Sequence, residues 1–268
     1  MSDGYDLESG PDPATAAARA PEPPVDDEAD VAYAVGIGPG NLEYLTPRGE
    51  RAIRDADVVV GFSTVVEFVE DLTEADPLTC GYRDEAEALE AFGRRVAAGE
   101  RGTAVLMGDP NHSGYQFVGK VRTAIRREAA HEAVDPPLLR IVPGISSLQV
   151  AASRARTPME DAEFVTLHKS GDCSADLERL ARAAGDRHLL VLPRPFDLMP
   201  GDVADFLLDR GADGDLEALV LEKLTHDDER IHRFTLAELA EHAGGSGREE
   251  TPFSDLVVLA VRTDVDLE

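Results

Sequence analysis

One segment near the amino end restricts the fold more than any other part of the chain, because an apolar strand there ends in a glycine-rich turn and continues into a helix. The segment reads Val35-Gly-Ile-Gly-Pro-Gly-Asn-Leu-Glu-Tyr-Leu-Thr46. Glycine permits positive φ angles and lets a ligand approach the backbone closely, so a turn of this kind can form a binding loop. Because Pro39 has no amide donor, the turn offers a phosphate fewer hydrogen bonds than an all-glycine loop would.

The spacing of these glycines excludes two common nucleotide-binding motifs. The dinucleotide motif G-x-G-x-x-G requires a glycine where the chain has Asn41, and no Gly-Lys-Ser/Thr follows to complete a P-loop. A nucleotide-dependent dehydrogenase is therefore not favoured. A ligand that carries no phosphate, such as S-adenosylmethionine, fits the turn better. A strand-to-helix turn that binds nothing remains the alternative.

From Val31 onwards, short apolar runs alternate with helical patterns, which predicts a mostly parallel α/β fold. The pattern falls into two halves, separated by a turn at Pro143-Gly144. We predict a disordered acidic tail over residues 1–30, an N-terminal α/β domain over residues 31–142 and a C-terminal α/β domain over residues 143–268. Strands are predicted at Val31–Ile37, Asp57–Val60, Leu78–Cys80, Thr103–Met107, Leu138–Val142, Glu163–Leu167, His188–Leu192, Leu216–Glu222 and Asp255–Arg262.

Caps and apolar stripes indicate where the helices lie. Thr46 precedes Pro47 at a first helical position, and Leu89, Phe92 and Val96 form an apolar stripe. Further helices are predicted from Tyr115 to Ala130 and from starts near Ser146, Ser174, Gly201 and Thr235.

The charge of the chain restricts its partners and its surroundings. It has 53 acidic and 26 basic residues and a formal net charge of −27, which argues against nucleic-acid and anionic-membrane partners. Lys120, Lys169 and Lys223 are the only lysines, and tryptophan is absent. Excess carboxylate with scarce lysine indicates a halophile with molar salt in its cytosol, where the Debye length falls to about 3 Å. An acidic protein of an ordinary mesophile is the alternative.

Cysteine usage and hydropathy indicate the compartment. Cys80 and Cys173 lie far apart and belong to no C-x-x-C motif, so neither a disulfide framework nor a zinc ribbon is expected. No apolar run reaches the roughly 20 residues of a membrane span, and the amino end is acidic where a signal peptide would be basic. We therefore expect a cytoplasmic protein. His226 and His232 lie near acidic residues, but their spacing fits no standard metal site, and no protein-bound metal is expected.

Two further strand ends carry polar residues in tight turns. One predicted strand continues into Gly108-Asp-Pro-Asn-His112, and another continues into Pro143-Gly-Ile-Ser-Ser147. Ligands of open α/β sheets bind at the carboxyl ends of strands, so a joint pocket is expected there. Asp109 is predicted either to cap its own turn or to bind the ligand. The hydroxyls of Ser146 and Ser147 either cap the next helix or contact the ligand.

Together these loops resemble the signature loops of the tetrapyrrole methylases. The similarity runs from about Val31 to the end of the chain and rests on Gly36–Gly40 with Leu45-Thr46, on Gly108–Pro110 and on Val142–Ser147. Within that family, the residues most similar to the cobalt-precorrin-7 (C5)-methyltransferases of cobalamin biosynthesis are Ser146–Arg154, Pro158–Asp161 and Val165–His168.

The resemblance implies two α/β domains with the active site in the cleft between them, a homodimer, and S-adenosylmethionine as the cofactor. Methyl transfer then requires a ring carbon to be positioned against the methyl group and requires no catalytic side chain. The residues implied for the cofactor are Pro39, Gly108, Asp109, His112, Ser146, Ser147, Leu192 and Leu224. The residues implied for the substrate are Gly38, Gly40, Arg154, His168, Lys169 and Arg194.

A tetrapyrrole substrate carries many carboxylates, which an acidic protein should repel unless its site is locally basic. Arg154, Arg156, His168, Lys169 and Arg194 are candidates for such a cluster, because arginine forks suit carboxylates. For each of them, pairing with a neighbouring acidic residue at the surface is the alternative. Any cobalt would arrive inside the substrate.

The expected function is methylation of C5 of cobalt-precorrin-7. The chain ends at Glu268, so methylation at C15 with decarboxylation is expected from a separate protein of the same pathway. The alternatives include another member of the family, acting at a different corrin position or as a diphthine synthase. A ribosomal-RNA methylase conflicts with the anionic surface. A non-catalytic tetrapyrrole carrier would bind tetrapyrrole with no need for S-adenosylmethionine.

Overall fold

The computed structural model describes residue 21 and residues 31–81, 85–112, 114–169, 171–195, 197–244 and 251–263. These residues form two compact units, Met1–Ile145 and Ser146–Glu268. The sequence placed the division slightly earlier, after Val142. The predicted tail over residues 1–30 lies outside the described residues, apart from Pro21.

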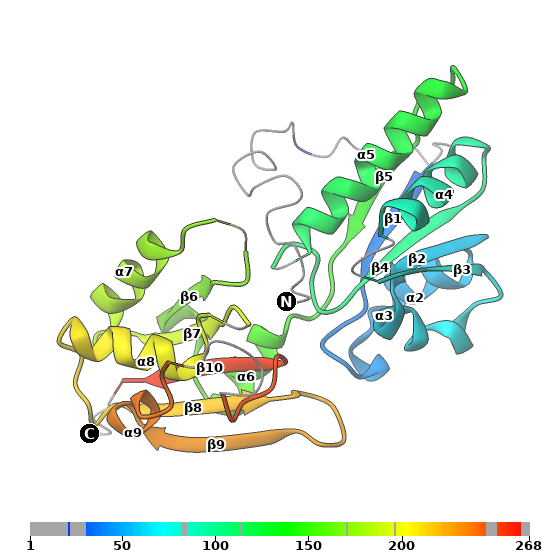
Figure 1. Ribbon diagram of the computed structural model, residues 1–268. Coiled ribbons are helices and arrows are strands. Elements are labelled where there is room, and N and C mark those ends of the chain that lie inside the picture. Colours follow the sequence, from blue (N-terminus) through cyan, green and yellow to red (C-terminus); the bar gives the residue numbers. More distant parts are fainter. Residues whose placement is uncertain are drawn as a thin grey trace. The chain divides into compact units, whose positions relative to one another are not determined.

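In the described part of the first unit, five parallel strands form one sheet in the order β3-β2-β4-β1-β5 (Figure 1). Strand β1 lies between β4 and β5, so Tyr33 pairs with Thr103 on one side and Arg140 on the other. The prediction of parallel strands is confirmed for this unit. The strands are β1 (Val31–Gly36), β2 (Val58–Phe62), β3 (Asp76–Cys80), β4 (Gly102–Leu106) and β5 (Leu138–Val142).

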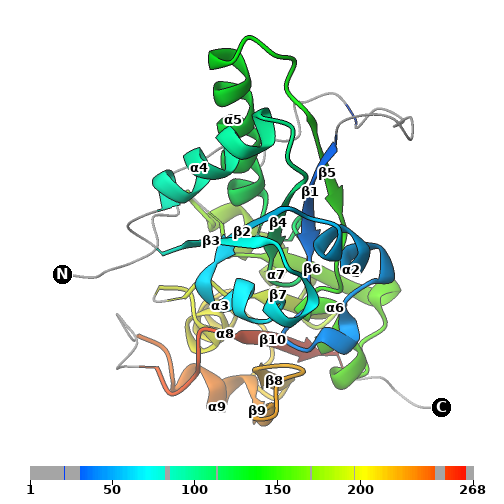
Figure 2. The same ribbon diagram turned by 90° about the vertical axis from the view of Figure 1, so that its right-hand side faces the viewer.

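Alternate residues of these strands form two cores, one on each face of the sheet. Val58 and Val60 pack in a cluster with α4 and α5, whereas Val59 packs in a second cluster with α2 and α3. Figure 2 shows α4 and α5 together beside the strands. The helical elements of this unit are η1 (Leu42–Tyr44), α2 (Pro47–Arg54), α3 (Ser63–Glu67), η2 (Glu70–Leu72), α4 (Glu85–Ala97) and α5 (Tyr115–His131).

The predicted helix signals of this unit are confirmed. The hydroxyl of Thr46 accepts a hydrogen bond from the amide of Gly49 at 3.1 Å, and Pro47 occupies the first position of α2. This capping satisfies an amide that has no partner within the helix. The predicted apolar stripe of α4 is buried in the core of the unit.

The second unit contains a mixed sheet in the order β6-β7-β10-β8-β9. Strands β6 and β7 are parallel, but the pairs β7–β10, β10–β8 and β8–β9 are antiparallel. The prediction of a mostly parallel sheet is therefore wrong for this unit. Its strands are β6 (Ala162–Thr166), β7 (His188–Leu192), β8 (Glu217–Glu222), β9 (Arg230–Thr235) and β10 (Val257–Arg262).

Strand β9 was not predicted, because it lacks the apolar run of a buried strand. Its sequence is Arg-Ile-His-Arg-Phe-Thr, it lies at the edge of the sheet, and most of its residues are exposed or half-buried. Charged side chains are usual on edge strands, where they discourage pairing with other chains. Only seven residues separate β9 from β8, too few for the crossover that a parallel pair needs.

Helices cover the sheet of the second unit as well. The largest core cluster joins residues of α7, α8 and α9 to residues of the strands, and α6 packs against β7 and β10. The predicted helix starts at Ser146, Ser174, Gly201 and Thr235 are confirmed to within one residue. None of the helices formed by the described residues is both long and apolar enough to cross a bilayer. The helical elements are α6 (Ser147–Ala155), η3 (Met159–Asp161), α7 (Ser174–Ala183), α8 (Pro200–Asp209) and α9 (Leu236–Ala240).

Candidate active site

Three loops meet at the carboxyl edge of the first sheet, where β1, β4 and β5 end. The loop after β1 is joined to the loop after β4 by two backbone hydrogen bonds between Gly38 and Gly108, at 2.7 and 3.3 Å. The amide of Ile37 also donates to the carbonyl of Leu106 at 2.9 Å. The loops after β1 and β4 are therefore in direct contact, as expected for the carboxyl edge of a parallel sheet.

Glycine allows these loops to approach one another backbone to backbone. A Cβ atom on Gly36 would lie 2.5 Å from the carbonyl oxygen of Gly108 and 2.7 Å from the amide of Gly144. A Cβ atom on Gly144 would overlap the same carbonyl oxygen. Because the obstructing atoms belong to the backbone, they cannot rotate away as a side chain could. At the carboxyl edge of the sheet, main-chain atoms therefore occupy positions that side chains would fill if these residues were not glycine.

Asp109 connects the second of these loops to the third. One carboxylate oxygen accepts a hydrogen bond from the amide of Asn111 at 2.7 Å, and the other accepts one from the amide of Gly144 at 3.1 Å. The first contact is the turn-capping role that the sequence offered as one alternative, and the second was not foreseen. Asp109 therefore holds the loop after β5 in place, whether or not it also contacts a ligand.

Two buried polar groups in and just after the loop that follows β4 have no hydrogen-bond partner within the described part of the chain. The imidazole Nδ1 of His112 and the hydroxyl of Tyr115 are both buried, and neither has a hydrogen-bond partner among the residues that the structure describes. A Cβ atom added to Gly108 would meet nothing within 4 Å, so the backbone there is open on one side. Buried polar atoms are normally paired. Unpaired donors and acceptors beside an open backbone suit a polar cofactor such as S-adenosylmethionine.

In the second unit, Ser146 begins the helix that the sequence predicted. Its hydroxyl accepts a hydrogen bond from the amide of Leu148 at 3.2 Å, and the side chain of Gln149 accepts one from the amide of Ser146 at 2.8 Å. Ser146 is 2% exposed and caps α6, as the sequence suggested for one of its two roles. Ser147 forms the first residue of the same helix. The capping role occupies one lone pair of the Ser146 hydroxyl and leaves the other available.

Leu224 lies in the connector between β8 and β9 and is 4% exposed. The residues on either side of it, Lys223 and Thr225, have φ angles of 50° and 72°. Such angles are uncommon for residues other than glycine, and they are exceptional for a β-branched residue. Strained backbone of this kind is concentrated at functional sites, and the role of Leu224 in cofactor binding stays a prediction.

The basic residues predicted for the substrate are engaged with acidic residues. Arg194 binds Asp197 through two hydrogen bonds at 2.8 and 2.6 Å. The ammonium group of Lys169 lies 2.6 Å from a carboxylate oxygen of Asp176. Nε of Arg154 donates a hydrogen bond to a carboxylate oxygen of Glu229 at 2.8 Å. Ion pairing, the alternative that the sequence left open, is thus present at all three residues.

Arg194, Lys169 and His168 nevertheless lie close together after β6 and β7. The guanidinium of Arg194 donates to the carbonyl of Lys169 at 3.3 Å. Burial lowers the pKa of His168, and the positive charge of Arg194 lowers it further. The imidazole is therefore neutral at neutral pH, and it can offer a substrate carboxylate a hydrogen bond but no charge. Leu192, predicted for the cofactor, ends β7, and its carbonyl accepts from the amide of Leu167 at 2.9 Å.

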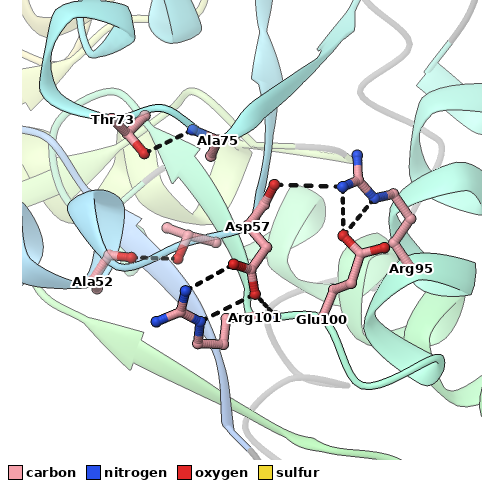
Figure 3. Close-up of polar contacts among 8 residues, drawn as sticks. Ala52, Asp57, Thr73, Ala75, Arg95, Glu100 and Arg101 are labelled. Atoms are coloured by element: carbon pink, nitrogen blue, oxygen red, sulfur yellow. Dashed lines mark hydrogen bonds and ion pairs between the residues drawn. The ribbon is translucent and has the colours of Figure 1, made fainter.

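The opposite edge of the first sheet has a hollow of about 550 Å³, around the amino ends of β1 and β4. None of the predicted site residues lines it. Arg101 donates to both carboxylate oxygens of Asp57, at 3.0 and 2.7 Å, and Arg95 donates to the carboxylate of Glu100 at 2.7 Å (Figure 3). The charged residues that line the hollow are Arg48, Arg51, Asp55, Glu100 and Arg101.

Three residues that the structure brings to these segments were not among the predicted site residues. Tyr115 and Thr225 carry buried hydroxyls without described partners, and Glu229 binds both Arg154 and the amide of Thr225. Tyr115 lies five positions after Pro110, at the end of the same strand-to-helix loop, so its position after a strand end could have suggested it. Nothing in the sequence pattern indicates the strain at Thr225 or the pairing of Arg154 with Glu229, which are separated by 75 positions.

A family model described as Tetrapyrrole (Corrin/Porphyrin) Methylases matches residues 32–240. The chain is 30% identical over 208 residues to a protein of Methanocaldococcus jannaschii named probable cobalt-precorrin-7 C(5)-methyltransferase. That alignment covers 78% of this chain and 90% of the relative.

Solved structures share the fold. The X-ray structure of a cobalamin biosynthetic enzyme, cobalt precorrin-4 methyltransferase, superposes with a TM-score of 0.67 at 19% identity, covering 87% of this chain and 95% of that one. Uroporphyrin-III C-methyltransferase from Thermus thermophilus, in complex with S-adenosylhomocysteine, gives a TM-score of 0.60 at 22% identity. That comparison covers 87% of this chain and 91% of that one.

Proposed function

This chain belongs to the tetrapyrrole (corrin/porphyrin) methylase family, and we propose that it is an S-adenosylmethionine-dependent C-methyltransferase that methylates C5 of cobalt-precorrin-7. One observation carries the cofactor part of the proposal, namely the contact of the loops after β1, β4 and β5 at a single sheet edge with unpaired buried polar atoms. The likeness to the Methanocaldococcus jannaschii protein supports the choice of substrate.

The residues of the first unit that would hold the cofactor are Pro39, the backbone at Gly108, Asp109 and His112. Ser146, Ser147, Leu192 and Leu224 are the candidates in the second unit. S-adenosylmethionine supplies a methyl group on a sulfonium, which is already a strong electrophile. The protein therefore needs to orient the two reactants, and an effective alignment can supply much of the rate enhancement. Asp109 serves that purpose by fixing the loop after β5 through the amide of Gly144.

The substrate part of the proposal concerns charge. His168, Lys169 and Arg194 form a local group in an acidic chain, and with Gly38, Gly40 and Arg154 they are the residues we propose for the carboxylates of the corrin precursor. Arg194 and Lys169 already pair with Asp197 and Asp176. Substrate carboxylates would therefore have to compete with these acids, while molar salt screens the repulsion between the substrate and the rest of the acidic surface. We also propose that the enzyme is a homodimer of a halophile and that a separate protein methylates C15.

The test is a turnover experiment in about 2 M KCl, the salt range in which surface charges are screened. The protein is incubated anaerobically with S-adenosylmethionine labelled with ¹³C in the methyl group and with cobalt-precorrin-7, and the product is examined by ¹³C NMR. The expected result is one new label at C5. A label at another ring position would replace the substrate assignment by that of another family member. Binding of tetrapyrrole without methyl transfer would support the carrier alternative.

A variant at the opposite edge of the sheet provides the control. Arg101→Gln alters an exposed ion pair beside the hollow and none of the residues proposed for cofactor or substrate. Its turnover should equal that of the unaltered protein within about twofold, because exposed pairs contribute little.

A further inference from the structure

The connector between β8 and β9 is held in a strained conformation by surrounding contacts. Lys223 and Thr225 both have left-handed φ angles, and Leu224 between them is buried. The amide of Lys223 donates to the carbonyl of Leu256 at 2.7 Å, and its ammonium group pairs with Asp228. Strained residues persist only where the surrounding structure fixes them, so these contacts must compensate for the strain.

Glu229 makes the contact that reaches the strained residue itself. One carboxylate oxygen accepts a hydrogen bond from the amide of Thr225 at 2.7 Å, and the other accepts from Nε of Arg154 at 2.8 Å. The hydrogen bond from Arg154 lowers the pKa of Glu229, and the amide of Thr225 lowers it further. Glu229 is therefore an anion at neutral pH, and its hydrogen bonds are of the stronger, charge-assisted kind.

Arg154 brings a second segment into this arrangement. It lies in the last turn of α6, the helix that Ser146 caps at its other end. Glu229 therefore connects the helix that carries Ser146 and Ser147 to the connector that carries Leu224. All of these residues belong to the second unit, and both segments are proposed to contact the cofactor.

One buried polar group of the connector lacks a hydrogen-bond partner among the described residues. The hydroxyl of Thr225 is buried and makes no hydrogen bond to any residue that the structure describes. A buried hydroxyl without a partner destabilises the protein unless something else satisfies it. The strain and the unsatisfied hydroxyl occur at the same residue.

We propose that Glu229 is a positioning residue for cofactor binding: with Arg154 it holds the connector in its left-handed form, and the Thr225 hydroxyl is thereby presented to S-adenosylmethionine. This inference rests on the proposed function, and it gives roles to two residues that were not among the predicted site residues and that the comparisons do not assign.

The test measures the affinity for S-adenosylhomocysteine by calorimetry and the KM for S-adenosylmethionine in three variants. Glu229→Ala should raise both constants about tenfold, the equivalent of 1.4 kcal/mol, while kcat at saturating cofactor changes by less than about threefold because positioning acts on binding. Glu229→Gln, which retains an acceptor for the Thr225 amide, should recover most of the loss. Glu178→Ala removes a comparable carboxylate from Arg210 in the same unit and should leave both constants unchanged.

Thr225→Val separates a binding role from a merely structural one. Valine keeps the branched shape and its backbone strain but lacks the hydroxyl. Because that hydroxyl has no partner in the described structure, the melting temperature without ligand should stay the same or rise, while the dissociation constant for S-adenosylhomocysteine should increase about fivefold. Thr225→Ser should bind like the unaltered protein.

Two outcomes would overturn the inference. Glu229→Ala that folds and binds S-adenosylhomocysteine as tightly as the unaltered protein would exclude the positioning role, and Thr225→Val with unchanged affinity would exclude the hydroxyl. If the unaltered protein itself binds no S-adenosylhomocysteine, the proposed function fails, and the inference fails with it.

Discussion

The two edges of the first sheet differ in how they are built. At the carboxyl edge, loops contact one another through backbone atoms, and buried polar atoms of His112 and Tyr115 lack described partners. At the amino edge there is a hollow of about 550 Å³, but its charged side chains include Arg101 and Glu100, which are already paired with Asp57 and Arg95. The size of a hollow is therefore a weaker guide to a binding site than the presence of buried polar groups that no described residue satisfies.

Both edges result from the same parallel arrangement. All five described strands of the sheet point the same way, so every strand-to-helix turn falls at one edge and every helix-to-strand turn at the other. The carboxyl edge contains Gly36 at the end of β1 and Gly108 and Gly144 in the following loops, and these glycines allow the backbone segments to pack closely. The carboxyl edge thus depends on main-chain packing and the amino edge on ion pairs, and substitutions at each edge can test this difference.

The largest effect is expected from Gly144→Ala. Its new Cβ would overlap the carbonyl oxygen of Gly108, and because backbone cannot move aside easily, we expect the free energy of unfolding to fall by about 3 kcal/mol. Urea denaturation measures this. The matched control is Gly102→Ala at the amino edge, whose Cβ would meet side-chain atoms of Val96 and Phe92 and should cost less. If Gly102→Ala lowered the free energy of unfolding more than Gly144→Ala, the proposed difference in packing between the two edges would be wrong.

A smaller effect is expected from Asp109→Ala. The substitution removes the acceptor for the amides of Asn111 and Gly144, so we expect a loss of about 1 to 2 kcal/mol in stability and a decrease of at least about tenfold in affinity for S-adenosylhomocysteine. Asp109→Asn retains one carbonyl acceptor and should lie between the two proteins. Calorimetric titration of folded variants provides the measurement. Unchanged affinity in Asp109→Ala would remove this residue from the binding site.

Salt should weaken the exposed ion pairs of the amino edge more than the backbone hydrogen bonds of the carboxyl edge. The Debye length is about 3 Å at 1 M KCl and shorter still at about 3 M, so exposed ion pairs such as Arg101–Asp57 weaken further over this range, whereas backbone hydrogen bonds are little affected. We therefore expect the dissociation constant for S-adenosylhomocysteine to change less than about threefold over this range. Titrations at several KCl concentrations give the answer. A steep loss of affinity with salt would show that ion pairs, and not main-chain groups, dominate binding.

The smallest effect is expected at the amino edge from Arg101→Gln under acidic conditions. Hydrogen bonds from Arg101 lower the pKa of Asp57 from 3.8 to about 2. Because the pKa is lower in the folded state, the pair stabilises the protein above pH 4, and this contribution is lost as the pH falls towards 2. The variant should therefore be slightly less stable than the unaltered protein at pH 6, and the difference should disappear between pH 4 and 2. Urea denaturation across this range would show it, and a difference that grows towards pH 2 would refute the assignment.

Much of the first unit could be predicted because its signals are local. Thr46 with Pro47 sets the start of α2, and apolar runs bounded by glycine set the strands. The three loops could be singled out for the same reason. The hydrogen bond between Asp109 and Gly144 could be identified only from the folded structure. The two residues are 35 positions apart in the sequence, and no periodicity links them.

The second unit was predicted less well because its distinguishing features are not local. Whether β10 runs parallel or antiparallel to its neighbours depends on the path of the chain and not on the composition of the strand. The exposed strand β9 has no apolar run that could indicate it. Arg154 was predicted for substrate carboxylates from its type and position, but the structure pairs it with Glu229, an acid distant in sequence.

Hydrogen exchange with and without S-adenosylhomocysteine tests most directly whether the carboxyl edge is the binding site. The ligand should slow exchange in residues 36–40, 108–112 and 114–115 of the first unit and in residues 146–149 and 222–229 of the second. Exchange around the hollow, in residues 48–55 and 99–103, should stay the same. Protection confined to the hollow, or no protection anywhere in the folded protein at millimolar ligand, would contradict the assignment of the site.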